Sequence, residues 1–267
     1  MFGSAQSRLA LGLLTVLTLL LFAMPTVAQE DAAEETPAEP AWAGKVSVGG
    51  SLSRGNVNSI KGVVEATAER VFDPHLVRLG ALAAYGENQT SGAGKTVDND
   101  KQEITEYYRY SFSESIFAYV DSLQGRDSVQ GIKFRFLGNF GPGWRAWHMG
   151  DKQFLDLETG VGYRYEHRIG KGNDIDGANA RFAATYANLL GPAEFRQTGE
   201  FLLPFDDTSG WLAKARTALS FPLTTSWSFE NALLIEYNNR PAASAPAGTG
   251  FLNKFELDYI VSLVYLF

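Results

Sequence analysis

The most regular feature of this sequence is an alternation of apolar and polar residues between Trp42 and the C-terminus. It is clearest in the last segment, where apolar or aromatic residues fill seven consecutive alternate positions. Because strand side chains point alternately to the two faces of a sheet, one face of this segment is apolar. That face carries Phe255, Leu257, Tyr259, Val261, Leu263, Tyr265 and Phe267, and Lys254, Glu256, Asp258 and Ser262 lie opposite. Such a face, ending in Phe, is typical of the membrane-insertion strand that closes an outer-membrane barrel.

The same period recurs upstream, so that twelve segments share it. They are residues 42–53, 60–69, 77–86, 103–112, 116–123, 132–140, 155–166, 180–189, 195–205, 211–221, 227–238 and 255–267. Most approach the roughly 9 to 11 residues with which a tilted strand crosses a bilayer. In the sixth segment we expect Ile132 to face outward with Phe134, and Lys133 to face inward. We predict an all-β fold: a transmembrane antiparallel up-and-down β-barrel of about 12 strands over residues 42–267.

The connections support this prediction, since outer-membrane barrels alternate short periplasmic turns with longer outer loops. Short turns are expected at residues 72–75, 113–115, 190–192 and 223–225, and long loops at 87–100, 168–177 and 238–250. The exceptions are two short outer loops, 54–58 and 206–210, and a long periplasmic turn expected at 141–152.

The N-terminal residues indicate export. Residues 1–28 have a basic position at Arg8, an apolar run from Leu9 to about Met24, and small residues up to Ala28 before a cut at Gln29, as in a secretory signal peptide. A permanent membrane anchor is the alternative, but the apolar run is shorter than a spanning helix needs. Residues 29–41 are acidic and rich in Ala and Pro, and we interpret them as a periplasmic linker. The expected location is the outer membrane of a Gram-negative bacterium.

Composition narrows the function further. The net charge of −7 argues against nucleic-acid binding, which needs a basic surface. The sequence contains no cysteine, so disulfides and thiolate metal sites are excluded. A mean hydropathy of −0.12 is too low for a helical membrane protein but suits a barrel, in which only alternate residues face lipid.

Several local motifs resemble a known family. Trp42–Gly50 is followed by Arg54-Gly55-Asn56-Val57-Asn58-Ser59, and Tyr107–Tyr110 and Gly160–Arg164 come later. With the terminal strand, these resemble the outer-membrane barrels called domain of unknown function 481, often described as salt-induced outer membrane proteins. The resemblance covers residues 42–267 and departs at Trp144–His148. It implies an outer-membrane barrel without an established activity and transfers no catalytic residue.

Charged residues of both signs occupy the polar face that would line the lumen. The candidates are Arg78, Glu103, Arg109, Arg135, Asp156, Glu158, Arg164, Arg181, Arg196, Arg216, Glu230, Glu256 and Asp258. Charges in a narrow barrel must be paired or hydrated. They either fill and stiffen the barrel or line a narrow passive pore for small polar or charged solutes, and barrel size does not decide between these.

An enzyme is the main alternative class. Outer-membrane hydrolases need a histidine base beside a nucleophile, and His167 is the best placed of the three histidines, with Ser128 and Ser209 on the same side. An exposed loop histidine is the simpler interpretation, so we expect no enzyme, no catalytic residue, no cofactor and no metal. A soluble periplasmic β-barrel that binds a ligand is a third possibility. The expected partners are outer-membrane lipid, the barrel-assembly machinery during insertion and a small polar solute.

Overall fold

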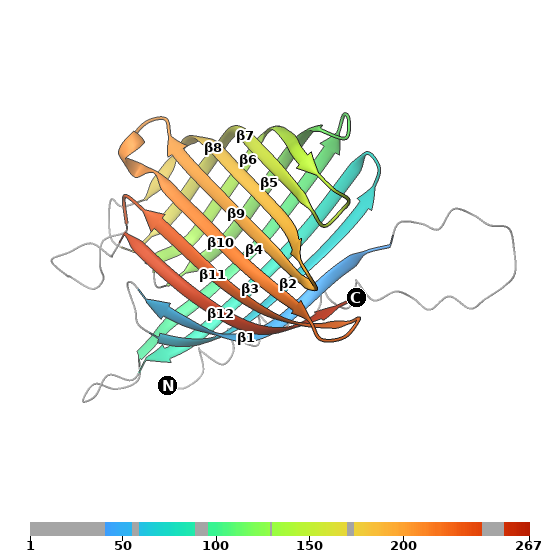
Figure 1. Ribbon diagram of the computed structural model, residues 1–267. Coiled ribbons are helices and arrows are strands. Elements are labelled where there is room, and N and C mark those ends of the chain that lie inside the picture. Colours follow the sequence, from blue (N-terminus) through green and yellow to red (C-terminus); the bar gives the residue numbers. More distant parts are fainter. Residues whose placement is uncertain (1–40, 55–58, 89–95, 129, 170–173, 242–253) are drawn as a thin grey trace, which may run out of the picture.

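The computed structural model is a closed antiparallel β-barrel of twelve strands in which each strand pairs with its sequence neighbours and β1 pairs with β12 (Figure 1). It describes residues 41–54, 59–88, 96–128, 130–169, 174–241 and 254–267, so the predicted signal peptide and nearly all of the linker lie outside the described residues. The strands are β1 (Ala43–Arg54), β2 (Ser59–Phe72), β3 (His75–Asn88), β4 (Thr96–Ser111), β5 (Ile116–Asp127), β6 (Ile132–His148), β7 (Phe154–Arg168), β8 (Ile175–Leu190), β9 (Ala193–Pro204), β10 (Leu212–Pro222), β11 (Trp227–Asn238) and β12 (Phe255–Leu266).

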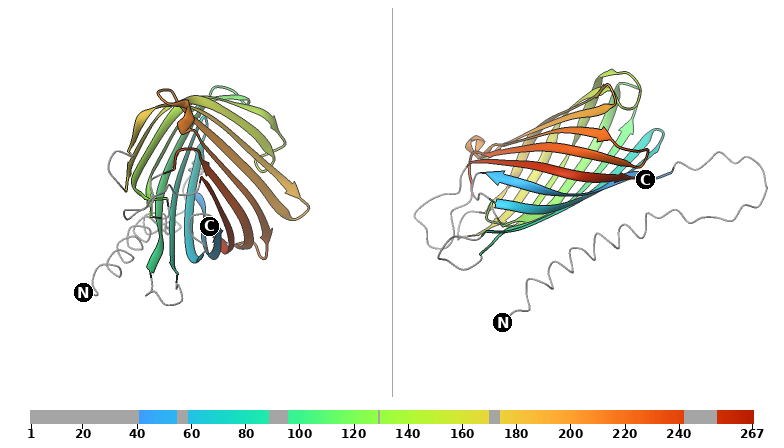
Figure 2. Two further views of the ribbon diagram at one scale, coloured as in Figure 1. Left: turned by 90° about the vertical axis from the view of Figure 1, so that its left-hand side faces the viewer. Right: turned by 60° about the horizontal axis from the view of Figure 1, so that its bottom comes forward.

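The barrel closes at the C-terminal residue. The backbone N–H of Gly44 donates to the carbonyl of Phe267 at 3.0 Å, and the N–H of Phe267 donates to the carbonyl of Gly44 at 3.1 Å. The register continues along both strands, with Val46 opposite Tyr265 and Leu52 opposite Tyr259. Figure 2 shows β1 and β12 side by side at this seam. Closure removes the unpaired edges that an open sheet would expose to lipid.

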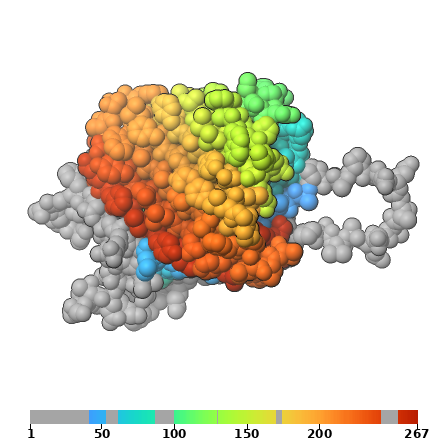
Figure 3. Space-filling view, in the orientation of Figure 1, coloured from blue at the N-terminus to red at the C-terminus, as the bar shows by residue number. Residues whose placement is uncertain are grey.

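The outer surface of the barrel is apolar and the inner surface polar, as the alternation predicts. Large hydrophobic side chains such as Val48, Phe140, Val161 and Leu263 are exposed on the outside, and most of the buried polar side chains face the lumen. Figure 3 shows one side of the wall as a continuous surface of side chains from the green to the red strands. This arrangement, with its outward apolar belt, is that of a transmembrane barrel. Among the described residues, no helix is long and apolar enough to cross a membrane.

Aromatic rings gather near both ends of the strands. Trp227 and Tyr265 contact each other near one mouth, with ring centroids 5.1 Å apart, and Trp211 stacks on Tyr237 at 4.8 Å near the other. Rings of this kind occupy the headgroup level on each side of a bilayer. The mouth that contains Gly44 and Phe267 has tight connections, two of them with glycines of positive φ: Gly150 (74°) and Gly191 (61°). We call it the periplasmic mouth, since short turns mark that side.

Two local expectations were wrong. The long turn expected at residues 141–152 does not exist, because β6 continues to His148 and the turn is a short one before Phe154. Gly141 and Pro142 resemble a turn in sequence, yet both keep their register with β5, opposite Tyr119 and Ala118. The second error is at Ile132, which is buried, with Lys133 exposed beside it. The register shifts between Ile132 and Phe134, and such a bulge reverses the alternation locally.

Candidate functional site

The lumen is the candidate functional site, because it gathers charged side chains from every strand. All of the predicted lumen candidates occupy inward positions of their strands, alternating with the lipid-facing residues. Several form ion pairs with the residue directly opposite on the neighbouring strand, as Arg78 does with Glu69 and Arg135 with Glu166. Opposite charges at such positions stabilise a strand pair.

The outer half of the lumen contains a buried ionic network centred on Glu166, whose side chain is fully buried. Its carboxylate accepts hydrogen bonds from Nε of Arg135 at 2.8 Å, Nε of Arg164 at 2.9 Å and Nε of Arg168 at 2.7 Å. The guanidinium groups of Arg164 and Arg168 also donate to the backbone carbonyls of Gly210 and Arg240. This network joins β6 and β7 to the outer connections of the barrel.

Two further contacts cross the lumen at the same level. Arg135 on β6 reaches Glu236 on β11, with Nη2 and Oε1 3.5 Å apart. Gln130, from the connection between β5 and β6, donates through Nε2 to Glu256 on β12 at 2.9 Å and accepts from Arg135 at 3.1 Å. These strands belong to opposite walls. The outer half of the lumen is therefore spanned by side chains.

Apolar side chains reinforce this closure. One cluster of inward residues joins β2 and β3 to β10, β11 and β12 through Val63, Ala84, Ala218, Ala232 and Ile260. A second brings together Leu137, Leu202 and Leu212 from β6, β9 and β10. Inward apolar residues interrupt the polar face that the alternation predicts, and they reduce the free cross-section of the lumen further.

In the middle of the lumen, single arginines each contact two or three carboxylates. Arg181 on β8 contacts three carboxylates, with Nε 2.7 Å from Glu200, Nη1 2.8 Å from Glu158 and Nη2 3.3 Å from Asp121. Arg216 on β10 donates to Glu65 at 2.9 Å and to Glu230 at 2.8 Å, so it links β10 to β2 and β11. The guanidinium of Arg181 is thus the shared cation of three carboxylates, and neutral donors assist it, since Asp121 also accepts from Asn139 and Glu158 from Tyr107.

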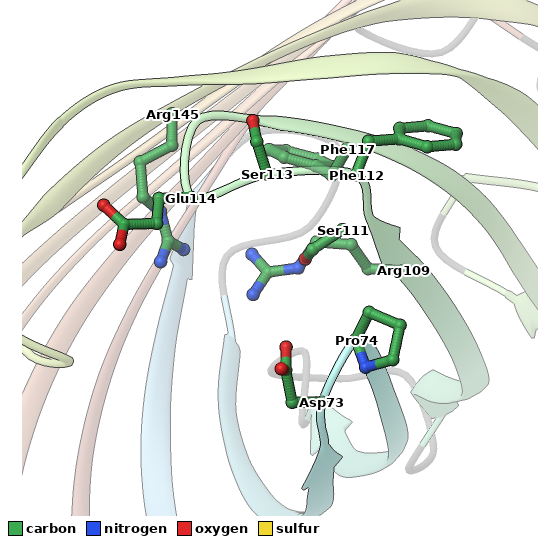
Figure 4. A pocket seen from close by; sticks show the side chains of 9 residues that line it. All are labelled: Asp73, Pro74, Arg109, Ser111, Phe112, Ser113, Glu114, Phe117 and Arg145. Carbon is green, nitrogen blue, oxygen red and sulfur yellow. The ribbon is translucent and has the colours of Figure 1, made fainter.

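The periplasmic half is open. A cavity of about 500 Å³ lies at this mouth, lined by Asp73, Pro74, Arg109, Ser111, Phe112, Ser113, Glu114, Phe117 and Arg145 (Figure 4). Arg109 and Arg145 extend into it from β4 and β6. Both bind Asp156: Arg145 donates to its two oxygens at 2.7 and 2.8 Å, and Arg109 at 3.4 Å. Each guanidinium also lies over an aromatic ring, that of Phe117 or Phe154. The cavity offers both signs of charge to a solute.

Some lumen residues were missed by the sequence reasoning. Arg145 was assigned to the supposed turn, Gln130 to a connection, and Arg168 lay beyond the predicted end of its strand. The signal for Arg168 was present, because it continues the alternation of Arg164 and Glu166. No such signal exists for Gln130, since it reaches the lumen from outside a strand.

The structure does not assemble the hydrolase site considered above. His167 is half exposed on the outer rim, and its Nδ1 lies 3.1 Å from Oδ2 of Asp174. Ser209 donates to Asp207, and the hydroxyl of Ser128 accepts from the N–H of Asp100. The backbone N–H of Arg168 and the ring of His167 hold the pKa of Asp174 below its usual range. Across the described ranges, no His, Asp or Glu side chains group in threes or more to hold a metal ion.

Comparison with known proteins gives the family. The family described as "Protein of unknown function, DUF481" matches residues 46–267. This chain belongs to that family. The family resemblance predicted from the local motifs is therefore confirmed. No curated protein matches the chain.

Solved structures resemble this DUF481 member only in fold. The NanC porin is 13% identical, with a TM-score of 0.48 and coverage of 82% of this chain and 98% of that one. The COG4313 outer membrane channel from Pseudomonas putida F1 is 12% identical, with a TM-score of 0.45 and coverage of 90% and 100%. Outer membrane phospholipase A from Escherichia coli is 8% identical, with a TM-score of 0.43 and coverage of 87% and 94%. A porin, a channel and a hydrolase share this general fold, so the likeness does not assign an activity.

Proposed function

We propose that this DUF481 barrel is a narrow passive pore for small polar or charged solutes in the outer membrane of a Gram-negative bacterium. The chain is exported by its signal peptide, inserted by the barrel-assembly machinery and held by outer-membrane lipid. It performs no catalysis. The observation that carries this proposal is the charged lining, which continues from the periplasmic cavity to the outer rim.

The constriction lies in the outer half, where Gln130 and Arg135 reach Glu256 and Glu236 on the opposite wall. These contacts are made by side chains, so separating them requires changes of rotamer and no rearrangement of the barrel wall. Passage of a small ion therefore needs only local separation of polar groups. The pore is consequently of low conductance.

The test is single-channel conductance of the purified full chain in planar bilayers. The wild type is expected to give small discrete steps. The double substitution Gln130→Ala with Glu256→Ala removes both partners of one cross-lumen contact, and larger steps are expected because that part of the lumen becomes wider. The matched control removes a polar pair from the lipid-facing side: Asn231→Ala with Tyr259→Phe, whose hydrogen bond is 2.7 Å long. Its conductance is expected to equal that of the wild type.

A filled, structural barrel is the second candidate, favoured by the burial of Arg135, Arg164 and Glu166, each at most 2% exposed. The same experiment separates the two. Absence of steps from both the wild type and the double variant, in protein whose migration remains heat-modifiable, contradicts the pore and supports the structural role.

A further inference from the structure

The outer wall of β4 and β5 carries a polar patch that faces away from the lumen. Its centre is Glu106 on β4, directly opposite Ser122 on β5, and the hydroxyl of Ser122 donates to Oε2 of Glu106 at 2.9 Å. Gln124 lies two positions beyond Ser122 on the same face and is exposed. We call Glu106, Ser122 and Gln124 the β4–β5 patch. It is flanked by the exposed apolar residues Ile104, Tyr108 and Val120.

The patch lies within the part of the wall that crosses the membrane. Glu106 is five residues from the periplasmic end of β4. A barrel strand rises about 3.3 Å per residue and tilts by roughly 40°, so Glu106 is about 12 Å above that end. The apolar band of an outer-membrane barrel is about 25 Å tall. The carboxylate of Glu106 is therefore near the middle of the band, where hydrocarbon offers it no hydrogen bond.

Other polar groups on the lipid-facing wall satisfy one another. The hydroxyl of Thr217 on β10 donates to Gln197 on β9, and that of Tyr259 on β12 donates to Asn231 on β11. Among the residues that the structure describes, Glu106 of the β4–β5 patch has one hydroxyl as its donor, although an ionised carboxylate accepts several hydrogen bonds. The amide of Gln124 has no hydrogen-bond partner within the described part of the chain. The patch therefore combines an unfilled acceptor with an unused donor.

We infer that the β4–β5 patch is the contact surface for a second copy of this chain. A two-fold axis along the membrane normal brings two such patches together at the same depth. Each Glu106 then accepts from the side-chain amide of Gln124 of the other copy, while its own Ser122 remains bound, so each copy supplies the donor that the other lacks. The neighbouring outward residue on β3 is the small Ala81, directly opposite Ile104, which lets a second barrel wall approach closely on that side. The contact is independent of whether the lumen conducts.

The absence of cysteine from the sequence makes the test direct. Single cysteines are placed beside the patch on each strand, Val120→Cys and Ile104→Cys, both at exposed outward positions. Val261→Cys on β12 is the matched control, since it is an outward valine four strands away from β4 around the barrel. Outer membranes that contain each full-length variant are oxidised, and the protein is separated on a non-reducing gel. Folding is checked by heat-modifiable migration, and the two patch variants keep the test valid if one fails to fold.

The expected result is a shift of at least one patch variant to the position of a dimer, with the Val261→Cys protein remaining a monomer. Addition of Glu106→Leu to the cross-linking variant is expected to abolish the dimer, because the shared acceptor is lost while the wall becomes more apolar. Two outcomes overturn the inference: equal cross-linking at Val120 and Val261, or monomers throughout in folded protein. Persistence of the dimer in the Glu106→Leu variant also overturns the assignment to this patch.

Discussion

Replacement of Glu166 by Gln is the most direct probe of the ionic network in the outer half of the lumen. Gln has nearly the same shape but no negative charge, so it leaves Arg135, Arg164 and Arg168 buried without their common counter-ion. Each hydrogen bond between charged groups contributes about 1.5 kcal/mol or more, and Glu166 accepts three through Nε atoms alone. The free energy of unfolding is expected to fall by about 4 kcal/mol, similar to the loss when other buried ion pairs are broken.

The measurement is urea unfolding of the full-length barrel in lipid vesicles, followed by tryptophan fluorescence. The matched control is Glu194→Gln, which removes a carboxylate from the exposed pair with Lys152. Exposed pairs contribute up to about 1 kcal/mol, so this variant is expected to stay close to the wild type. If Glu166→Gln unfolds within about 1 kcal/mol of the wild type, the network does not hold the outer half closed, and the reasoning from burial is refuted.

Two other predictions follow from particular contacts. A Cβ atom at Gly160 would lie 2.3 Å from the carbonyl oxygen of Phe140 and 2.7 Å from the hydroxyl of Tyr119. Gly160→Val is therefore expected to lower the free energy of unfolding by about 2 kcal/mol or more. Gly199→Val, with nothing within 4 Å, is expected to refold like the wild type, and equal refolding yields for the two variants would contradict this view. The pKa of Asp174 lies below its usual range because the carboxylate accepts from the N–H of Arg168 and faces His167. The stabilisation that ionised Asp174 contributes is therefore fully present above the unfolded pKa of about 4. It is lost as the pH falls through the lower pKa of the folded state. The measurement is hydrogen exchange of the Arg168 amide in the wild type and in an Asp174→Asn variant at each pH. The wild-type amide is expected to lose its extra protection in that pH range. Protection that does not change with pH would contradict this assignment.

The strands were predictable because lipid imposes a strict period on the outward face. Phe255 to Phe267 illustrate this, since each outward position needs an apolar side chain whatever lies in the lumen. Where the local backbone departs from this period, the prediction failed. Ile132 and Lys133 sit at a bulge, and the sequence contains no marker of the extra residue. At Gly141-Pro142-Gly143 the turn residues continue a strand, with Pro142 on the outward face.

The lumen was predictable only in part, for a different physical reason. Alternation identifies inward positions but not which of them meet across the barrel. The contact between Arg135 and Glu236 depends on the curvature of the closed sheet and on side-chain length, and neither is visible in a linear sequence. Residues next to each other in register, such as Arg145 and Asp156, become predictable once the turn between their strands is correctly placed.

Arginine side chains are much more exposed in the periplasmic half of the lumen than in the outer half. This difference indicates which half limits the passage of ions through the proposed pore. The side chains of Arg135, Arg164 and Arg168 in the outer half are 1 to 2% exposed. Those of Arg78, Arg109 and Arg145 in the periplasmic half are 14 to 38% exposed. Water therefore contacts the periplasmic charges and is largely excluded from the outer network. It follows that substitutions in the outer half should change conductance, whereas loss of a hydrated periplasmic charge should have little effect.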